Sequence, residues 1–157
     1  PLSYNGWGDV LVIVFFGFVP VGGTYYVQAL TWTPDVTIAS LICGLLIDTL
    51  LVVNNYRDRE ADARSGKRTV IVRFGEKFGR YFYLMLGVTA SLLCLCFLRE
   101  GHFLAALLPQ LYLIPHFLTW KRMVKIYSGK KLNSILGETS RNMLFMGVLI
   151  AIGMLVS

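Results

Sequence analysis

Long uncharged stretches constrain this chain more than any other feature. Residues 10–34, 81–98 and 101–120 contain no Asp, Glu, Lys or Arg. Apolar stretches of about 18 residues or more are long enough to cross a lipid bilayer as helices. Only 15% of the 157 residues are charged, whereas soluble domains have about a quarter. The sequence therefore predicts an all-α, polytopic integral membrane protein with a single transmembrane domain, residues 1–157.

The apolar stretches predict five transmembrane helices. Pro34 suits the first turn of a helix, and Trp32 before it suits the membrane interface. Residues 57–77 and 121–131 are expected to be loops, and the first has room for a short helix. The predicted helices cover about residues 9–31, 34–56, 78–98, 102–120 and 132–157.

Basic residues are distributed unequally between the two sides of the predicted bundle. Thirteen of the 15 Lys and Arg residues lie in the loops 56–80 and 121–131, and Arg99 alone lies on the opposite side. Loops rich in Lys and Arg remain in the cytoplasm. We therefore expect the N-terminus to be cytoplasmic and the C-terminus to be outside. The net charge of +6 is then explained by topology, which excludes nucleic acid as a partner.

The segment 54–69 carries the candidate chemistry. Residues 57–68 contain three carboxylates and five basic groups, directly after the second predicted helix. Asp58 and Asp62 are four residues apart, so on a continued helix their Cβ atoms lie about 6 Å apart on one face. Mg²⁺ suits such a pair, because it takes one or two carboxylates and completes its shell with water and phosphate oxygens. We predict that Asp58 and Asp62 are metal ligands and catalytic residues.

Neighbouring polar residues suit the binding of a diphosphate. Asn54 and Asn55 precede Asp58 by one helical turn and offer neutral oxygen ligands. Arg57, Lys67 and Arg68 are suited to binding a diphosphate and neutralising its charge as it leaves. Gly66 allows the turn that returns Lys67 and Arg68 to the site. A solvated loop with incidental ion pairs is the alternative that the charge run alone favours.

The amino-acid sequence of this segment resembles that of a known family. NNYRDREADARSGKRT, followed by VRFG, is similar to the second Asp-rich motif of the UbiA superfamily of intramembrane prenyltransferases, in the branch that uses 1,4-dihydroxy-2-naphthoate for menaquinone synthesis. Residues 23–28, GTYYVQ, resemble a second motif of that branch. The resemblance covers the C-terminal half of such an enzyme, five of its nine helices. The first Asp-rich motif, of NDxxD type, is absent.

The resemblance implies a Mg²⁺-dependent transfer of a polyprenyl group from polyprenyl diphosphate to 1,4-dihydroxy-2-naphthoate. It implies a site that faces the cytoplasm in the bacterial cytoplasmic (inner) membrane. A missing N-terminal half is then a required partner, together with membrane lipid. The chain begins at Pro1 without Met, and we expect an upstream part. We also expect this half to be inactive on its own, because the other Asp-rich motif lies in the missing half.

Several intramembrane residues leave two interpretations open. Asp48 either faces the reaction cavity as a catalytic group or makes a structural hydrogen bond. Tyr25 and Tyr26 either bind substrate by shielding a carbocation or simply line membrane helices, and the same holds for Phe15 and Phe16. Glu138 and Arg141 form either an intrahelical pair or a cavity-facing pair that contacts the acceptor.

Two other functions compete with the prenyltransferase. One is a membrane scaffold or transporter half whose basic loops bind anionic lipid. Asp58 and Asp62 would oppose such binding. The other is a CDP-alcohol phosphotransferase, whose longer motif begins with DGxxAR, a pattern that this chain lacks.

Overall fold

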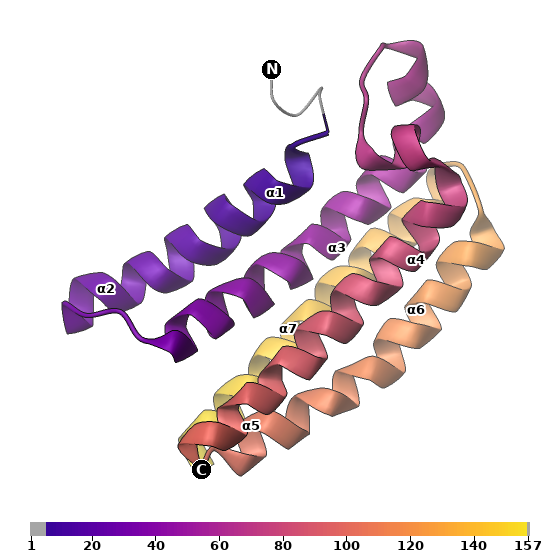
Figure 1. Cartoon of the computed structure of the whole chain (residues 1–157). Helices are drawn as coiled ribbons and strands as arrows, with labels where there is room; N and C mark the ends of the chain where they lie inside the picture. The colour runs from indigo at the N-terminus through magenta and orange to yellow at the C-terminus, as the bar shows by residue number, and fades with distance from the viewer. Residues whose placement is uncertain (1–5, 157) are drawn as a thin grey trace.

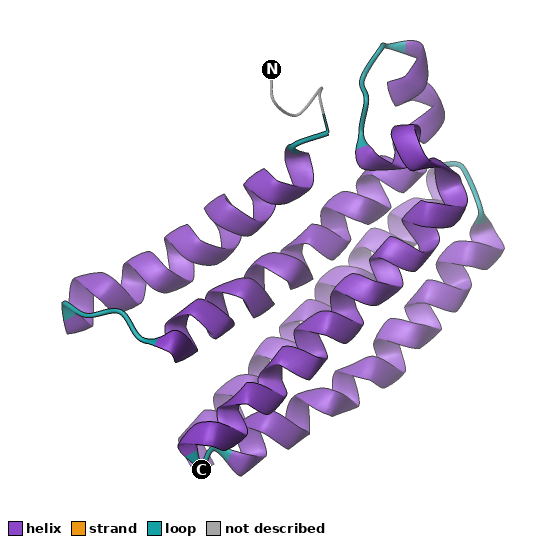
Figure 2. Ribbon diagram, in the orientation of Figure 1, coloured by secondary structure: helices purple, strands orange, loops and turns teal. Residues whose placement is uncertain are grey.

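The computed structural model describes residues 6–156, and these form helices and short connecting turns without any strand (Figure 2). Five helical stretches are long and apolar enough to cross a membrane. They are Gly8–Ala29, Pro34–Arg64, Val70–Glu100, Phe103–Ile126 and Lys130–Val156. The predicted all-α membrane bundle of five helices is therefore confirmed. Ser157, the last residue of the fifth predicted helix, lies outside the described residues.

The first stretch is irregular. It consists of α1 (Gly8–Val12), a π-helical segment (Ile13–Gly22) that contains Pro20, and α2 (Gly23–Ala29). Proline lacks the N–H that the helical ladder needs, and wider helical turns are one way to accommodate it. This stretch packs along α3 (Pro34–Arg64), where Gly17 and Gly44 allow a close backbone approach.

Helix α3 is the longest element and reaches eight residues beyond the predicted end at Tyr56. The Thr33 side chain accepts a hydrogen bond from the Val36 amide at its start, next to Pro34. Its 31 residues span about 46 Å, more than the roughly 30 Å of bilayer hydrocarbon. Charged residues at one end can therefore stand clear of the apolar layer on the same continuous helix.

The other three stretches complete the bundle (Figure 1). Helix α4 (Val70–Leu93) begins earlier than expected, with a kink at Gly75, and continues as a 3₁₀ segment, Cys94–Glu100. Helices α5 (Phe103–Leu107) and α6 (Leu113–Ile126) are joined by 3₁₀ turns, and α6 continues past the predicted end at Trp120. Helix α7 (Asn133–Val156) packs against α3, α5 and α6.

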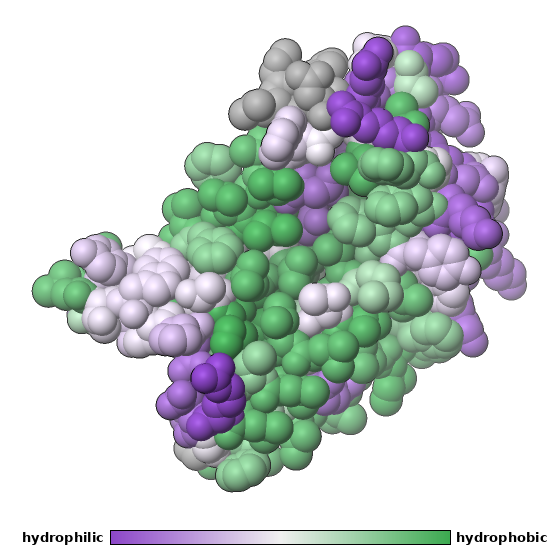
Figure 3. Space-filling view, in the orientation of Figure 1, coloured by the Kyte–Doolittle hydropathy of each residue, from purple (hydrophilic) through white to green (hydrophobic). Residues whose placement is uncertain are grey.

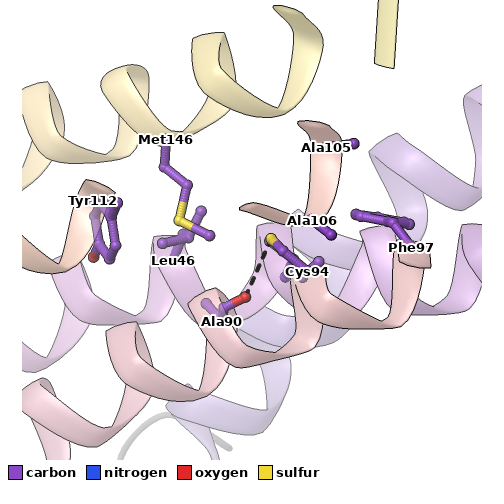
Figure 4. Packing of buried hydrophobic residues seen from close by; sticks show 9 residues of the cluster. Leu46, Ala90, Cys94, Phe97, Ala105, Ala106, Tyr112 and Met146 are labelled. Carbon is purple, nitrogen blue, oxygen red and sulfur yellow. Dashed lines mark hydrogen bonds between the residues drawn. The ribbon is translucent and has the colours of Figure 1, made fainter. Parts of the chain in front are cut away.

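Two hydrophobic clusters hold these helices together. One joins α3, α4, α5 and α7 near the turn at Gly101, and includes Leu46, Cys94, Phe97 and Met146 (Figure 4). The other is centred on Tyr56, Tyr83, Met123 and Ile135. Both clusters use α3, so the position of α3 is fixed along most of its length.

The segments 57–80 and 121–131 lie at the same end of the bundle, as expected. Arg57 contacts Asn133 and Arg59 contacts Tyr127 across this end. Figure 3 shows hydrophilic residues gathered there and a broad apolar surface below. We call this end of the bundle the charged end.

Candidate functional site

Arg57 organises the first of two polar groups at the charged end. Its Nε and Nη2 atoms donate to the two carboxylate oxygens of Asp58 at 2.7 and 2.6 Å. Nη2 also donates to Asn54 Oδ1 at 2.7 Å, one turn earlier on α3. Nη1 donates to Asn133 Oδ1 at 2.8 Å, at the start of α7. Asp58 keeps 37% of its side-chain surface exposed, so its carboxylate remains accessible from solvent.

Asp62 and Lys67 form the second polar group. The α3 helix ends in a turn in which Gly66 has a φ of 76°. The Gly66 amide donates to Ala63 O and the Lys67 amide to Asp62 O, a pattern typical of helix C-termini with a left-handed glycine. The chain reverses there, and Lys67 Nζ lies 3.3 Å from Asp62 Oδ2. The predicted return of Lys67 towards the aspartates is thus observed in the structure.

Asn55 extends this second group into the bundle. Its side chain is 4% exposed, and its Oδ1 atom has no hydrogen-bond partner among the described residues. Asn55 and Lys67 line a small cavity of about 50 Å³ together with Asp9 and Thr69. Such a volume is large enough for water, which would satisfy the amide oxygen.

The two aspartates lie on one helical stripe, as the spacing predicts. Since α3 runs unbroken to Arg64, Asn55, Asp58 and Asp62 occupy positions i, i+3 and i+7. Within residues 6–156, no three His, Cys, Asp or Glu side chains gather closely enough to hold a metal ion. Two carboxylates and an unpartnered amide oxygen fit an ion that takes its remaining ligands from water and a phosphate group.

A layer of stacked cations and aromatic rings supports this end of α3. The Arg59 guanidinium lies 4.6 Å from the ring centre of Tyr56 and 4.9 Å from that of Tyr127. Arg80 donates to the Tyr56 hydroxyl at 2.9 Å and pairs with Glu76 at 3.2 Å. The Glu76 carboxylate raises the pKa of the Tyr127 phenol. These contacts tie the loop 127–129 to the two aspartates' helix.

An apolar groove begins one helical turn below Asn54. It has a volume of about 710 Å³ and runs between α3 and α7. Leu50, Ile47 and Cys43 line it on α3, and Ser140, Leu144 and Gly147 line it on α7. A second cavity of about 690 Å³ shares Val21, Ala39 and Phe97 with this groove and continues to the opposite end of the bundle.

The structure does not bring every predicted site residue to the aspartates. Arg68 is exposed on the loop after Lys67. Tyr25 and Tyr26 lie on α2, about 25 Å along the first stretch from its start at the charged end. Tyr25 lines the second cavity, at the opposite end, and Tyr26 is 51% exposed.

Asp48 lies inside the protein rather than on the groove wall. It is fully buried, and neither carboxylate oxygen has a hydrogen-bond partner among the described residues. Its carboxyl interacts with that of Asp9, which reaches it from α1. Of the two interpretations of Asp48, a place on the groove wall is not what the structure shows, and the residue instead lies against a second acidic side chain.

Glu138 and Arg141 do not form the intrahelical pair considered above. Glu138 pairs with Arg122 of α6 at 2.9 Å and accepts a hydrogen bond from Thr119 at 3.3 Å. Arg141 is exposed and lines a separate groove. Glu138 therefore has its ion-pair partner on α6, in Arg122, and not on its own helix α7.

Sequence reasoning missed two residues that contact predicted site residues, Asn133 and Asp9. Asn133 is 76 residues from Arg57, and no local spacing connects them. Asp9 stood as a lone acid at the start of an apolar helix, which is a signal of function or pairing that could have been used. Its partner Asp48 is apparent only from packing.

Comparisons with known proteins identify relatives of this chain. Residues 1–149 match the UbiA prenyltransferase family. The 1,4-dihydroxy-2-naphthoate octaprenyltransferase of Haemophilus influenzae is 34% identical over 99% of this chain and 51% of its own length. That of Escherichia coli is 42% identical over 60% of this chain and 30% of its own length.

A more distant relative also aligns along the chain. The UbiA prenyltransferase domain-containing protein 1 of Dictyostelium discoideum is 30% identical over 99% of this chain and 46% of its own length. The chain therefore spans about half the length of the curated relatives that match it throughout. No solved structure matches this chain.

Proposed function

This chain belongs to the UbiA prenyltransferase family, and we propose that it is part of an enzyme that transfers a polyprenyl group from polyprenyl diphosphate to 1,4-dihydroxy-2-naphthoate. The names of the Haemophilus and Escherichia relatives support this acceptor and the menaquinone pathway. The predicted family resemblance is confirmed by the match over residues 1–149.

One observation carries the proposal: a polar group with a free carboxylate face stands at the mouth of a long apolar groove. A polyprenyl diphosphate has the same division, a charged head on a long apolar tail. The head fits beside Arg57, Asp58 and Asn54, and the tail fits the groove between α3 and α7 that begins at Leu50. The continuing cavity, which includes Tyr25, gives a long tail further apolar room.

Asp58 and Asp62 are the residues that would hold Mg²⁺. A divalent ion bound there supplies positive charge that stabilises the diphosphate as it leaves. Both carboxylates are already beside cations, Arg57 and Lys67, so ligand exchange is needed when substrate arrives. The unpartnered Asn55 oxygen lies on the same stripe and is suited to orient a ligand water.

Other residues of the site stabilise the charge of the leaving diphosphate or exclude water. Arg57 and Lys67, once released from the carboxylates, are placed to donate hydrogen bonds to the departing diphosphate. The apolar walls of the groove exclude water from the allylic cation that remains. Asn54 and Asn133 hold the Arg57 guanidinium at the groove mouth. Arg68, Tyr26 and Asp48 stay predicted site residues without a contact to this arrangement.

We further propose that the charged end faces the cytoplasm of a bacterial cell. Thirteen of the 15 basic residues belong to this end, which supports the assignment through the positive-inside rule. The relatives are about twice as long, which supports a requirement for further helices that close the groove and supply the other Asp-rich motif.

The test is a membrane assay with Mg²⁺, a polyprenyl diphosphate and 1,4-dihydroxy-2-naphthoate. The chain is assayed alone and joined to the N-terminal half of the Haemophilus relative. We expect prenylated naphthoate only from the joined protein, and none when EDTA removes divalent ions. Absence of product from a folded joined protein would overturn the proposed reaction. Full activity of the chain alone would overturn the requirement for further helices.

A further inference from the structure

Arg141 is a charged residue in a helix that is long and apolar enough to span a membrane. It lies eight residues after Asn133, about 12 Å along α7 from the charged end. It is exposed, and it forms no hydrogen bond or ion pair with any residue in the range 6–156. Glu138, one turn earlier, is already paired with Arg122. A lone Arg at this depth is costly unless an anion or water meets it.

The surroundings of Arg141 form a groove of their own. It has a volume of about 530 Å³ and lies between α6 and α7. Its lining residues are Leu111, Ile114, Pro115, Arg141, Asn142 and Phe145. None of these residues lines the groove between α3 and α7, so the two grooves are separate.

The order of polar and apolar residues follows the depth in the membrane. Side chains of a helix point towards its N-terminus, and the N-terminus of α7 is at the charged end. The Arg141 guanidinium therefore reaches up towards the membrane surface. Phe145 lies one turn deeper on α7, and Leu111 and Ile114 lie farther from the charged end than Thr119, which contacts Asn142. The groove thus has a cationic top and an apolar bottom.

We propose that this groove binds an anionic phospholipid, with its phosphate on Arg141 and one acyl chain along Ile114, Leu111 and Phe145. Lipid is the medium that an exposed face of a membrane helix meets, and its phosphates are the anions present at that depth. An anionic headgroup is favoured over a zwitterionic one because no carboxylate of the groove lining opposes it.

The proposal is tested by native mass spectrometry of the purified chain in detergent. Palmitoyl-oleoyl phosphatidylglycerol and the matching phosphatidylcholine are titrated separately. We expect one phosphatidylglycerol to bind more tightly than phosphatidylcholine. Arg141→Gln should weaken phosphatidylglycerol binding roughly tenfold or more and leave phosphatidylcholine unchanged, because a charge-assisted hydrogen bond is lost. Lys125→Gln is the matched control, an exposed basic residue of the same end that is outside the groove.

A second measurement covers the case in which Arg141→Gln fails to fold. In Phe145→Trp, the new indole should be quenched more strongly by phosphatidylglycerol with brominated acyl chains than by brominated phosphatidylcholine. The same Phe145→Trp protein carrying Arg141→Lys should keep most of this preference. Equal binding of the two lipids by the wild-type chain would overturn the proposal. So would an equal loss in Lys125→Gln and Arg141→Gln, or quenching without a headgroup preference.

Discussion

Arg57 donates two hydrogen bonds to the carboxylate of Asp58, its neighbour in the chain, at 2.7 and 2.6 Å. Adjacent residues on a helix point about 100° apart, so this pair forms only because the long Arg side chain folds back along α3. The carboxylate is thereby neutralised while its outer surface stays accessible. A metal ion that arrives can then replace Arg57 at the Asp58 carboxylate. The released Arg57 can donate its hydrogen bonds to the diphosphate.

We expect Asp58→Asn and Asp62→Asn each to abolish Mg²⁺-dependent prenyl transfer in the joined enzyme. Asn keeps the shape of Asp but loses the charge that an ion requires. Product formation is measured against Mg²⁺ concentration. Glu60→Gln is the control, because Glu60 is exposed and lies between the two aspartates on the same helix. Activity within a few-fold of wild type in either Asp variant would rule out the metal assignment.

Arg57→Lys should raise the KM for polyprenyl diphosphate roughly 10- to 150-fold, with little change in the KM for the acceptor. Lys cannot reproduce the planar fork that reaches Asn54, Asp58 and Asn133 together. Initial rates against donor concentration check this. In Arg64→Lys, the exposed last turn of the same helix is altered, and the donor KM should stay at the wild-type value. A defect confined to the acceptor would mean that Arg57 has been assigned to the wrong substrate.

Lys67→Ala should also weaken the use of the donor, because Lys67 lies 3.3 Å from Asp62. Arg68→Ala, its exposed neighbour, was expected from sequence to behave alike, but the structure gives it no contact with either aspartate. We therefore expect a smaller effect from Arg68→Ala. Donor titrations of the two variants side by side decide the order, and a larger defect in Arg68→Ala would contradict it.

Gly17→Ala should destabilise the protein by about 1–3 kcal/mol, since a Cβ at this position would lie 2.4 Å from the Ser40 carbonyl oxygen. The first helical stretch would have to move away from α3. Thermal unfolding in detergent measures the loss. Gly23→Ala is the matched control, because nothing lies within 4 Å of its added Cβ. Equal melting temperatures for the two variants would show that the close approach of the helices is not tight.

Asp9→Asn and Asp48→Asn should have non-additive effects on stability, because the two carboxyls interact inside the protein. Either single change removes the contact between the two carboxyl groups, so the second change should add little to the first. Melting temperatures of both single variants and the double variant complete the cycle. Turnover measured in the same proteins tests the catalytic role predicted for Asp48. Strict additivity of the melting shifts would show that the two acids are independent.

Much of the candidate site followed from local spacing. The i, i+4 spacing of Asp58 and Asp62 was sufficient to place them on one face, because a helix relates such residues without help from the rest of the fold. Gly66 was sufficient to predict the return of Lys67, since a left-handed glycine ends a helix in a known way. Helix α3 is longer than predicted, because it continues through a charged segment at which hydropathy marks the end of a membrane span.

The membrane class, the number of spanning helices and the polar face of α3 could be predicted without a structure, because hydropathy and helical periodicity are properties of neighbours in the chain. Contacts between residues far apart in the chain could not be predicted in this way. Asn133 of α7 contacts Arg57, and Asp9 of α1 contacts Asp48. Glu138 pairs with Arg122 of α6 and not with a residue of its own helix. The groove below Asn54 likewise exists only between helices. Such contacts depend on how helices rotate and approach one another, which the packing of many side chains sets together.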